Sequence, residues 1–232
     1  NAITSAIDFV ISENLPKVYT LTGRGEVALN DTFTKALDSE NILTASLSLI
    51  TTGGVPTDAE AVLILAPESD ISEDEKAMLE AYTQAGGNLL YISSPPQDNV
   101  LTDLNSLMSQ YGVSVQDGIL VEGNPNYYMW EAPYYLLPVL QSHAITAPLS
   151  DGGYKVLLPI AQGLTIAQEL PENVTASSLL VSSSQSFSKA AGLNLTTYEK
   201  EEGDTQDTQF VSKEQQKRSV LIEDITGINC QF

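Results

Sequence analysis

Residues 55–92 constrain the fold most, because they contain a complete strand, loop, helix and second strand. Residues 61–66 form a short, nearly unbroken apolar run, which is typical of a strand buried on both faces, and Pro67 ends it. Ser72 and Glu75 have the spacing of a capping box, in which each side chain satisfies a free backbone N–H group at a helix start. The segment therefore predicts two strands joined by a helix.

The expected helix has a clear end as well as a clear start. Apolar residues follow the capping box at helical spacing, namely Met78, Leu79, Tyr82 and Ala85. Gly86 and Gly87 then supply a residue that can adopt the left-handed conformation common at helix ends. Residues 89–92 return as the next strand.

Strand and helix patterns alternate on both sides of this unit. The expected strands are 17–22, 42–50 and 113–121, and the expected helices are 31–39, with Phe33, Ala36 and Leu37 inward, and a helix that Asn99 caps and Gly112 ends. Such alternation is typical of α/β proteins, in which right-handed crossovers place helices on the two faces of a mostly parallel sheet. We predict an α/β fold of this kind.

The second half of the chain has a less regular pattern. Residues 124–140 are rich in Tyr and Pro and predict an irregular excursion, whereas 156–160 and 179–182 are candidate strands of the same sheet. Residues 198–218 are polar, which predicts a mobile loop or surface hairpin before a last strand at 220–225. The predicted organisation is a lead-in helix (1–16), an α/β domain (17–197) and a polar segment with a strand or tail (198–232).

The charge of the chain excludes several classes of partner. Thirty acidic residues against 10 basic ones give a net charge of −20, without a basic stripe that could follow a phosphate backbone. Nucleic acid and anionic lipid head groups are therefore poor partners. No run of about 18 apolar residues is present to span a membrane. Because the chain starts with Asn1 and not with Met, we expect it to be either a processed protein or a piece of a longer one, with any signal or anchor outside it.

Candidate polar side chains follow the expected strands. In open α/β sheets the ligand crevice lies beyond the carboxyl ends of the strands. This rule selects the segments 23–26, 67–70, 93–96 and 122–124, and the candidate binding residues among them are Arg24, Glu26, Glu68, Asp70, Ser93 and Ser94. The carboxylates there fit either acid/base work, cation binding or a solvated loop. The GRGE loop lacks the spacing of a nucleotide-binding glycine motif, so we interpret it as a tight turn.

Nucleophilic catalysis and metal binding have little support in the sequence. His143 is the only histidine, and no GxSxG motif accompanies it. Cys230 is the only cysteine, so a disulfide within the chain and a cysteine-based metal cluster are both impossible. We predict no metal, no cofactor and no catalytic residue.

The most distinctive surface candidate is a cluster of aromatic residues in the 124–140 segment. Its members are Tyr127, Tyr128, Trp130, Tyr134 and Tyr135. Aromatic side chains in a Pro-rich loop can form a protein-binding patch or a platform on which sugars stack. They can equally pack back onto the sheet as a small satellite core. The sequence leaves these interpretations open.

Several segments together resemble one known family. They are GRGE after the first strand, VPTDAEAVLILAPESDISEDEKAMLEAYTQAGGNLLYIS, LTDLNSLMSQYGVSVQDGILVEG, HAIT and LLVSSSQSFSK. In order and spacing, residues 18–189 resemble the extracytoplasmic domain of GldG-like proteins, which are auxiliary components of ABC-type transport systems named for gliding motility. The resemblance implies a glutamine-amidotransferase-like or flavodoxin-like three-layer sandwich, related to the amino-terminal domain of an intraflagellar-transport subunit.

The chain departs from the enzymes of that fold at one decisive turn. Amidotransferases carry a cysteine nucleophile at a strand-to-helix turn, and the corresponding turn here reads Ser93-Ser94-Pro95-Pro96. The thiolate is therefore missing. After Tyr198 the family usually continues into a Gly-Pro-Phe segment, whereas this chain has DTQF and then polar residues.

The resemblance and the missing nucleophile predict a non-enzymatic, extracytoplasmic interaction domain of an ABC-transporter auxiliary subunit. The resemblance implies permease and ATPase partners from the same system, and contact with the membrane only through anchoring helices outside this chain. It also implies that the lead-in helix is a membrane-proximal stalk. A carbohydrate or peptide is a further candidate ligand. The alternatives are a carbohydrate-binding domain that uses the aromatic cluster, and a hydrolase that uses Glu26, Glu68 or Asp70.

Overall fold

The computed structural model describes residues 9–11, 14–95, 100–206 and 221–222, and the chain divides into two compact units. Of the described residues, unit 1 holds those up to Ser93 together with 100–107 and 221–222. Unit 2 holds 94–95 and 108–206. The 17–197 domain expected from the sequence thus contributes residues to both units.

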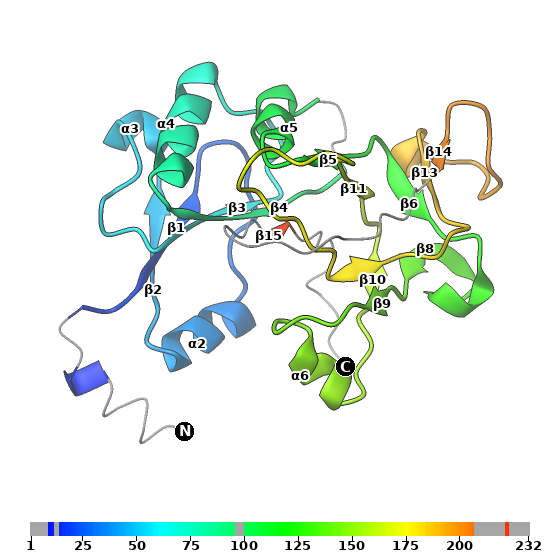
Figure 1. Cartoon of the computed structure of the whole chain (residues 1–232), viewed down its shortest axis with the longest axis horizontal. Helices are drawn as coiled ribbons and strands as arrows, with labels where there is room; N and C mark the ends of the chain where they lie inside the picture. Colours follow the sequence, from blue (N-terminus) through cyan, green and yellow to red (C-terminus); the bar gives the residue numbers. More distant parts are fainter. Residues whose placement is uncertain (1–8, 12–13, 96–99, 207–220, 223–232) are drawn as a thin grey trace. The chain divides into compact units, whose positions relative to one another are not determined.

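Unit 1 is built on a five-stranded sheet in which all neighbouring strands are parallel (Figure 1). In spatial order the strands are β15 (Leu221–Ile222), β4 (Asn88–Ile92), β3 (Ala61–Leu65), β1 (Lys17–Leu21) and β2 (Leu43–Leu47). The central strand β3 pairs with β1 on one side and β4 on the other, and its Val62 and Ile64 side chains are fully buried. The apolar run that predicted this strand is therefore explained by burial.

Helices cover both faces of this sheet, which confirms the predicted α/β class. They are α2 (Asp31–Ser39), α3 (Leu49–Thr52), α4 (Glu73–Gln84) and α5 (Thr102–Ser109). Figure 1 shows α2 on one side of the sheet and α4 with α5 on the other. The capping box at Ser72 and Glu75 is present, and Gly86, just after the C-cap of α4, has a φ of +99°. The predicted start and end of α4 are thus confirmed.

Three predictions in unit 1 need correction. The strand expected at 42–50 ends at Leu47, because Leu49–Thr52 turns into α3 and buries Leu49. The face of α2 expected to point inward is not buried, and Phe33 is 41% exposed. The spacing of apolar residues identified the apolar face of α2. It does not predict how much of that face the neighbouring edge strand β2 covers. Asn99, the expected cap of α5, lies outside the described residues.

The lead-in helix and the last strand are described only in part. Residues 9–11 are helical, and their side chains are exposed. Leu221–Ile222 forms β15, which pairs with β4 within the strand expected at 220–225. No helix in the described ranges is long and apolar enough to cross a membrane.

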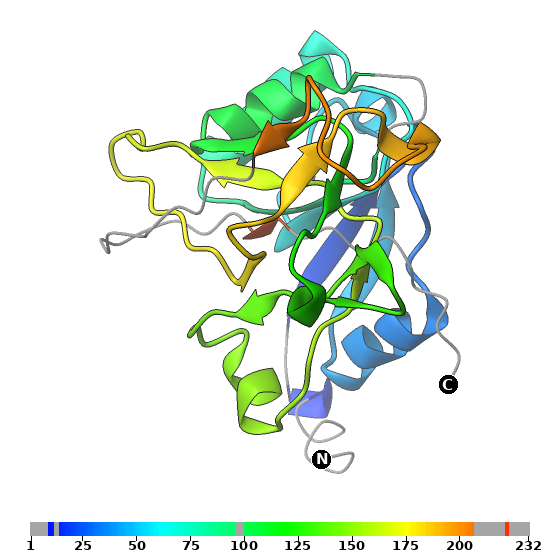
Figure 2. The same cartoon turned by 90° about the vertical axis from the view of Figure 1, so that its right-hand side faces the viewer.

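Unit 2 consists of short strands in four small sheets (Figure 2). The strands are β5 (Val113–Val115), β6 (Ile119–Val121), β7 (Tyr128–Met129), β8 (Ala132–Leu136), β9 (Val139–Leu140), β10 (Leu158–Pro159), β11 (Leu164–Ile166), β12 (Leu180–Val181), β13 (Phe187–Lys189) and β14 (Thr205–Gln206). The helices are η1 (Pro125–Tyr127), α6 (Ala147–Asp151) and η2 (Gly192–Asn194). The sheets are β10-β8-β7, β11-β5, β12-β9 and β14-β13-β6, all antiparallel.

The sequence predicted unit 2 poorly. The single strand expected at 113–121 is two strands in different sheets, separated by a turn at Gly118. The candidate strands at 156–160 and 179–182 pair with β8 and β9 and do not join the parallel sheet. The 124–140 segment, expected to be irregular, contains η1, β7, β8 and β9. Strands of two or three residues are too short for a periodic pattern, and their pairing depends on distant partners.

A buried lysine fixes part of the segment that was expected to be mobile. The Lys189 side chain in β13 is completely buried, and its ammonium donates to the Glu199 carbonyl (2.6 Å) and to Glu201 Oε2 (2.7 Å). Asp204 Oδ2 lies 3.1 Å from the same ammonium. These contacts attach residues 199–204 to β13, whereas residues 207–218 of that segment lie outside the described residues.

Gly118 provides a test of the unit 2 fold. Its φ is +81°, and a Cβ atom there would lie 1.9 Å from the Lys189 carbonyl oxygen. Gly118→Ala should lower the free energy of unfolding by about 1–3 kcal/mol beyond the backbone strain alone, because the neighbouring strand must move. Urea denaturation measures this loss.

Gly153→Ala is the matched control. Gly153 has a φ of +67° and no atom near the position of a Cβ, so its substitution adds only backbone strain of about 1 kcal/mol. Equal losses for the two variants would contradict the close packing of Gly118 against β13.

Candidate functional site

The order of the strands in unit 1 creates a topological switch point between β1 and β3. The crossover from β1 leads to β2 on one side, whereas the crossover from β3 leads to β4 on the other side. Ligands of open α/β sheets bind outside the carboxyl ends of the strands at such a point. The loops that follow β1 and β3 are therefore the candidate site, and they carry Arg24, Glu26, Glu68 and Asp70.

These two loops are hydrogen-bonded to each other. The carbonyl oxygen of Arg24 accepts from the backbone N–H groups of Glu68 (2.9 Å) and Ser69 (3.1 Å) and from the Ser69 hydroxyl (3.3 Å). Gly25, with a φ of +81°, permits the close approach, since a Cβ atom there would lie 2.8 Å from Glu68 Oε2. The two loops thus form one connected structure at the switch point.

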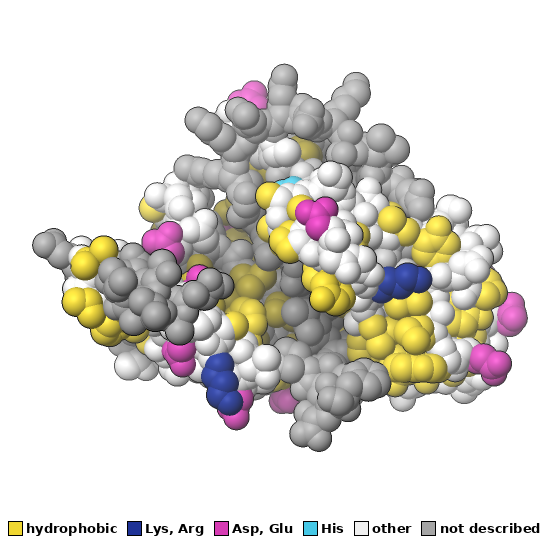
Figure 3. Space-filling model, turned by 90° about the horizontal axis from the view of Figure 1, so that it is seen from below, with side chains coloured by type: hydrophobic (Ala, Val, Ile, Leu, Met, Phe, Trp, Pro, Cys, Tyr) yellow, Lys and Arg dark blue, Asp and Glu magenta, His cyan; other side chains and the backbone are white. Residues whose placement is uncertain are grey.

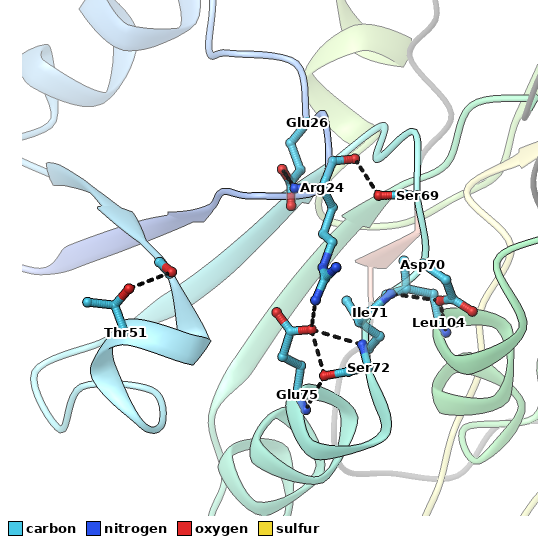
Figure 4. Close-up of polar contacts among 10 residues, drawn as sticks. Arg24, Glu26, Thr51, Ser69, Asp70, Ile71, Ser72, Glu75 and Leu104 are labelled. Carbon is cyan, nitrogen blue, oxygen red and sulfur yellow. Dashed lines mark hydrogen bonds and ion pairs between the residues drawn. The ribbon is translucent and has the colours of Figure 1, made fainter.

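The Arg24 side chain pairs with Glu75 at the start of α4 (Figure 4). Glu75 Oε2 accepts from the Ser72 N–H group (2.8 Å), the Ser72 hydroxyl (2.8 Å) and the Arg24 guanidinium. The Glu75 side chain is only 5% exposed. Helix N-termini attract anions, and here the helix's own carboxylate occupies that position and Arg24 neutralises it.

The surroundings of Glu75 keep it ionised. Burial opposes the charged carboxylate, but hydrogen bonds from Ser72 and the charge and hydrogen bond of Arg24 outweigh it, so the pKa of Glu75 lies below its ordinary value of 4.5. A carboxylate with a lowered pKa is a poor proton donor or acceptor at neutral pH. Glu75 is therefore a structural group.

Asp70 also has a structural partner. Its Oδ2 accepts from the backbone N–H of Asp103 (2.7 Å), and its Oδ1 accepts from those of Leu104 (3.1 Å) and Ile71 (2.9 Å). Figure 4 shows Asp70 directed at the start of α5. Asp70 thus caps a helix that is distant in sequence, and both of its oxygens are engaged.

The remaining residues of the predicted crevice are placed as follows. Glu26 Oε2 accepts from the Arg24 N–H at 2.7 Å, while its buried Oε1 makes no hydrogen bond to the described residues. Ser93 is 1% exposed, and its hydroxyl likewise makes none, so no described base is hydrogen-bonded to it. Ser94 belongs to unit 2, whereas the other five candidate residues belong to unit 1.

Groups suited to metal binding or triad catalysis are not assembled in the described residues. They contain no cluster of three or more His, Cys, Asp or Glu side chains that could hold a metal ion. His143 is exposed, and its Nδ1 accepts from the Ile145 N–H at 3.2 Å. Cys230 lies outside the described residues.

The predicted aromatic cluster lies in unit 2, on η1, the β7–β8 hairpin and its turn. Tyr127, Tyr128, Tyr134 and Tyr135 are half-buried, and Trp130 is 57% exposed. The Trp130 ring meets the Tyr135 ring edge to face, with centroids 5.2 Å apart. Tyr134 also packs against a small buried core of unit 2, so the cluster combines an exposed edge at Trp130 with a part that packs back onto the fold.

Sequence reasoning missed the partners that hold the polar residues. Glu122, at the end of β6, is buried and accepts from the N–H groups of Asn124 (2.9 Å) and Ser183 (3.0 Å) and from the Ser183 hydroxyl. The strand-end rule selected Glu122, but nothing in a chain with 30 acidic residues indicated that Glu122 or Lys189 would be buried. The capping box was the one available signal, since it placed Glu75 at the edge that Arg24 reaches.

Comparison with protein families places the chain in a transport system. A family described as an ABC-type uncharacterized transport system matches residues 15–226. The chain belongs to this family. It is accordingly an auxiliary component of an ABC-type transport system. None of the curated proteins compared with the chain matches it.

Solved structures resemble the chain in fold. The "mmIFT52 N-terminal domain" is 17% identical with a TM-score of 0.55, and the match covers 73% of this chain and 74% of that one. It agrees with the expected relation to an intraflagellar-transport subunit and concerns the fold alone. A glutamine amido transferase from Methylobacillus Flagellatus is 15% identical over 67% of this chain and 59% of its own, and its TM-score of 0.39 is too low to support an argument.

The lowered pKa of Glu75 predicts how stability changes with pH. Because ionised Glu75 is favoured in the folded state, its contribution is present above its ordinary pKa of 4.5 and is lost as the pH falls through the folded value. Glu75→Gln should therefore flatten the acid-side loss of unfolding free energy. Urea denaturation between about pH 3 and pH 7 measures this slope.

Glu73→Gln is the control for this experiment. Glu73 lies in the same first turn of α4 but is exposed. The control should keep the acid-side slope of the parent protein. A Glu75→Gln variant with an unchanged slope would show that the Arg24 and Ser72 contacts do not stabilise the carboxylate.

Proposed function

We propose that this chain is a non-catalytic, extracytoplasmic interaction domain of its ABC transport system. The observation that carries the proposal is the engagement of the strand-end polar groups with structural partners. Arg24 pairs with Glu75, and Asp70 caps α5, at the edge where α/β enzymes place their reacting groups. Ser93 lies at the turn where amidotransferases carry their nucleophile. Its hydroxyl makes no hydrogen bond to a basic side chain among the described residues.

The proposed partners are the permease and ATPase subunits of the same system, and the proposed attachment to the membrane is through helices outside this chain. Membership of an ABC transport family supports these partners. The GldG-like resemblance noted from the sequence supports an extracytoplasmic position and leads us to propose a relation to gliding-motility systems. The excess of acidic residues disfavours direct binding to anionic lipid.

A carbohydrate-binding domain is the second candidate function. The observation in its favour is the exposure of Trp130 and its edge-to-face contact with Tyr135, since exposed aromatic faces can stack on sugar rings. A hydrolase based on Glu26, Glu68 or Asp70 is less well supported, because Asp70 accepts three backbone hydrogen bonds and Glu26 one.

Affinity capture tests the proposed assembly. The full-length protein, captured from membranes of the cells that naturally produce it, should retain a permease subunit and an ATPase subunit after detergent extraction. Quantitative mass spectrometry of the captured material measures their ratio. A preparation that captures neither subunit from the extract would contradict the proposal.

An activity screen tests the non-catalytic part. The purified protein should turn over no amide, ester or glycoside substrate above the rate of a Ser93→Ala, Glu26→Gln double variant. Turnover by the parent that this double variant loses would show that the strand-end edge is an active site, and the interaction proposal would be wrong.

A further inference from the structure

The β7–β8 hairpin has a strained turn at its tip. Met129 pairs with Ala132, so Trp130 and Glu131 form a two-residue turn, and their φ angles are +57° and +55°. Positive φ at both positions is the feature of a type I′ turn, which favours Asn and Gly. For Trp130 and Glu131 this left-handed conformation is energetically unfavourable. Backbone strain of this kind is concentrated at functional sites in proteins.

Aromatic side chains lie beside this strained turn. After the Met129–Ala132 pair, the next pair is Tyr128 with Leu136, so residues 133–135 bulge from the hairpin. Bulges redirect side chains and are frequent beside binding sites. The Tyr134 ring lies 5.0 Å from that of Tyr135 and 5.7 Å from that of Tyr198, between centroids. We call Trp130, Glu131, Tyr134, Tyr135 and Tyr198 the hairpin surface.

The charge around the hairpin surface is negative. Residues 108–206 of unit 2 contain ten acidic residues against three basic ones, of which Lys189 is buried and paired. Glu131 is exposed in the turn itself. Tyr198 is followed by the exposed Glu199, Lys200, Glu201 and Glu202, of which Glu201 pairs with Lys189. Figure 3 shows one face of the molecule, on which hydrophobic side chains gather and acidic and basic side chains are scattered between them.

Aromatic faces and carboxylates share an affinity for cations. A guanidinium or ammonium group over an indole or phenol ring is attracted by the ring's electron density, and Trp is the best of the aromatic partners. A neighbouring carboxylate adds a charge-assisted hydrogen bond. A second copy of this chain would bring the same negative charge, and a neutral sugar would gain no charge attraction from the acidic border.

We propose that the hairpin surface binds an Arg- or Lys-bearing segment of a partner protein. The inference rests on the proposed interaction function and specifies the chemistry of one of its contacts. The cation lies over the Trp130 and Tyr135 rings, and Glu131 pairs with it. A short segment can bind in this way despite limited shape complementarity, because a few aromatic side chains contribute most of the binding free energy.

The chain provides its own reporter for this interaction, because Trp130 is its only tryptophan. The probe is a 12-residue peptide of alternating Gly and Arg, about the length that a single surface accommodates. Its titration into the full chain should change the Trp130 fluorescence saturably, and added salt should weaken binding. A Gly/Glu peptide of equal length should produce no change.

Two substitutions distinguish specific recognition from general attraction. Asn suits the left-handed turn, so Trp130→Asn should fold with an unchanged or higher melting temperature, yet its affinity for labelled Gly/Arg peptide should fall at least about tenfold in fluorescence anisotropy. Tyr154→Leu removes an aromatic side chain of unit 2 that is 66% exposed and outside the hairpin surface. This control should bind the peptide as the parent does.

Equal peptide affinity for Trp130→Asn and the parent would overturn the inference, because binding would then reflect net charge alone. A neutral glucan hexasaccharide that shifts Trp130 fluorescence while the peptide does not would also overturn it, in favour of sugar binding. Co-purification with permease and ATPase separates the two proposals. If the parent keeps these subunits but does not bind the peptide, only this inference fails.

Discussion

The ion pair between Arg24 and Glu75 is the interaction on which the candidate edge of unit 1 depends. It joins the loop after β1 to the first turn of α4, the helix that follows β3. Glu75 serves two purposes at once, since it completes the capping box with Ser72 and provides the counter-ion for Arg24. Loss of either charge would leave the other partly buried without compensation, which proteins tolerate poorly.

The Arg24–Glu75 ion pair lies at the switch point of the sheet, where other open α/β proteins bind their ligands. An open parallel sheet has its natural ligand crevice between β1 and β3, where backbone N–H groups and helix dipoles face a common space. Here the chain occupies that position with its own charges, and Asp70 turns away to cap α5. We therefore propose that partner binding takes place at a different kind of surface, the strained aromatic hairpin of unit 2. Fold and function need not share one edge of a sheet.

The parts of the structure that the sequence predicted well are those encoded locally. The apolar run of β3, the capping box and the glycine that ends α4 each lie within a few residues of the element they define. Unit 2 was harder, because strands of two or three residues form only through pairing with distant segments. Arg24, Glu26, Glu68 and Asp70 follow β1 and β3 as expected, and their use as a binding site stays a prediction. Their partners Glu75, Asp103 and Leu104 depend on tertiary contacts that spacing does not encode.

A double-mutant cycle on Arg24 and Glu75 tests the central claim most directly. The free energies of unfolding of Arg24→Met, Glu75→Gln and the double variant are compared with that of the parent at neutral pH. We predict a coupling energy of about 1–3 kcal/mol, as expected for charged groups in direct, partly buried contact. Losses that add to within about 0.5 kcal/mol would contradict the account, because the two side chains would then stabilise the edge independently.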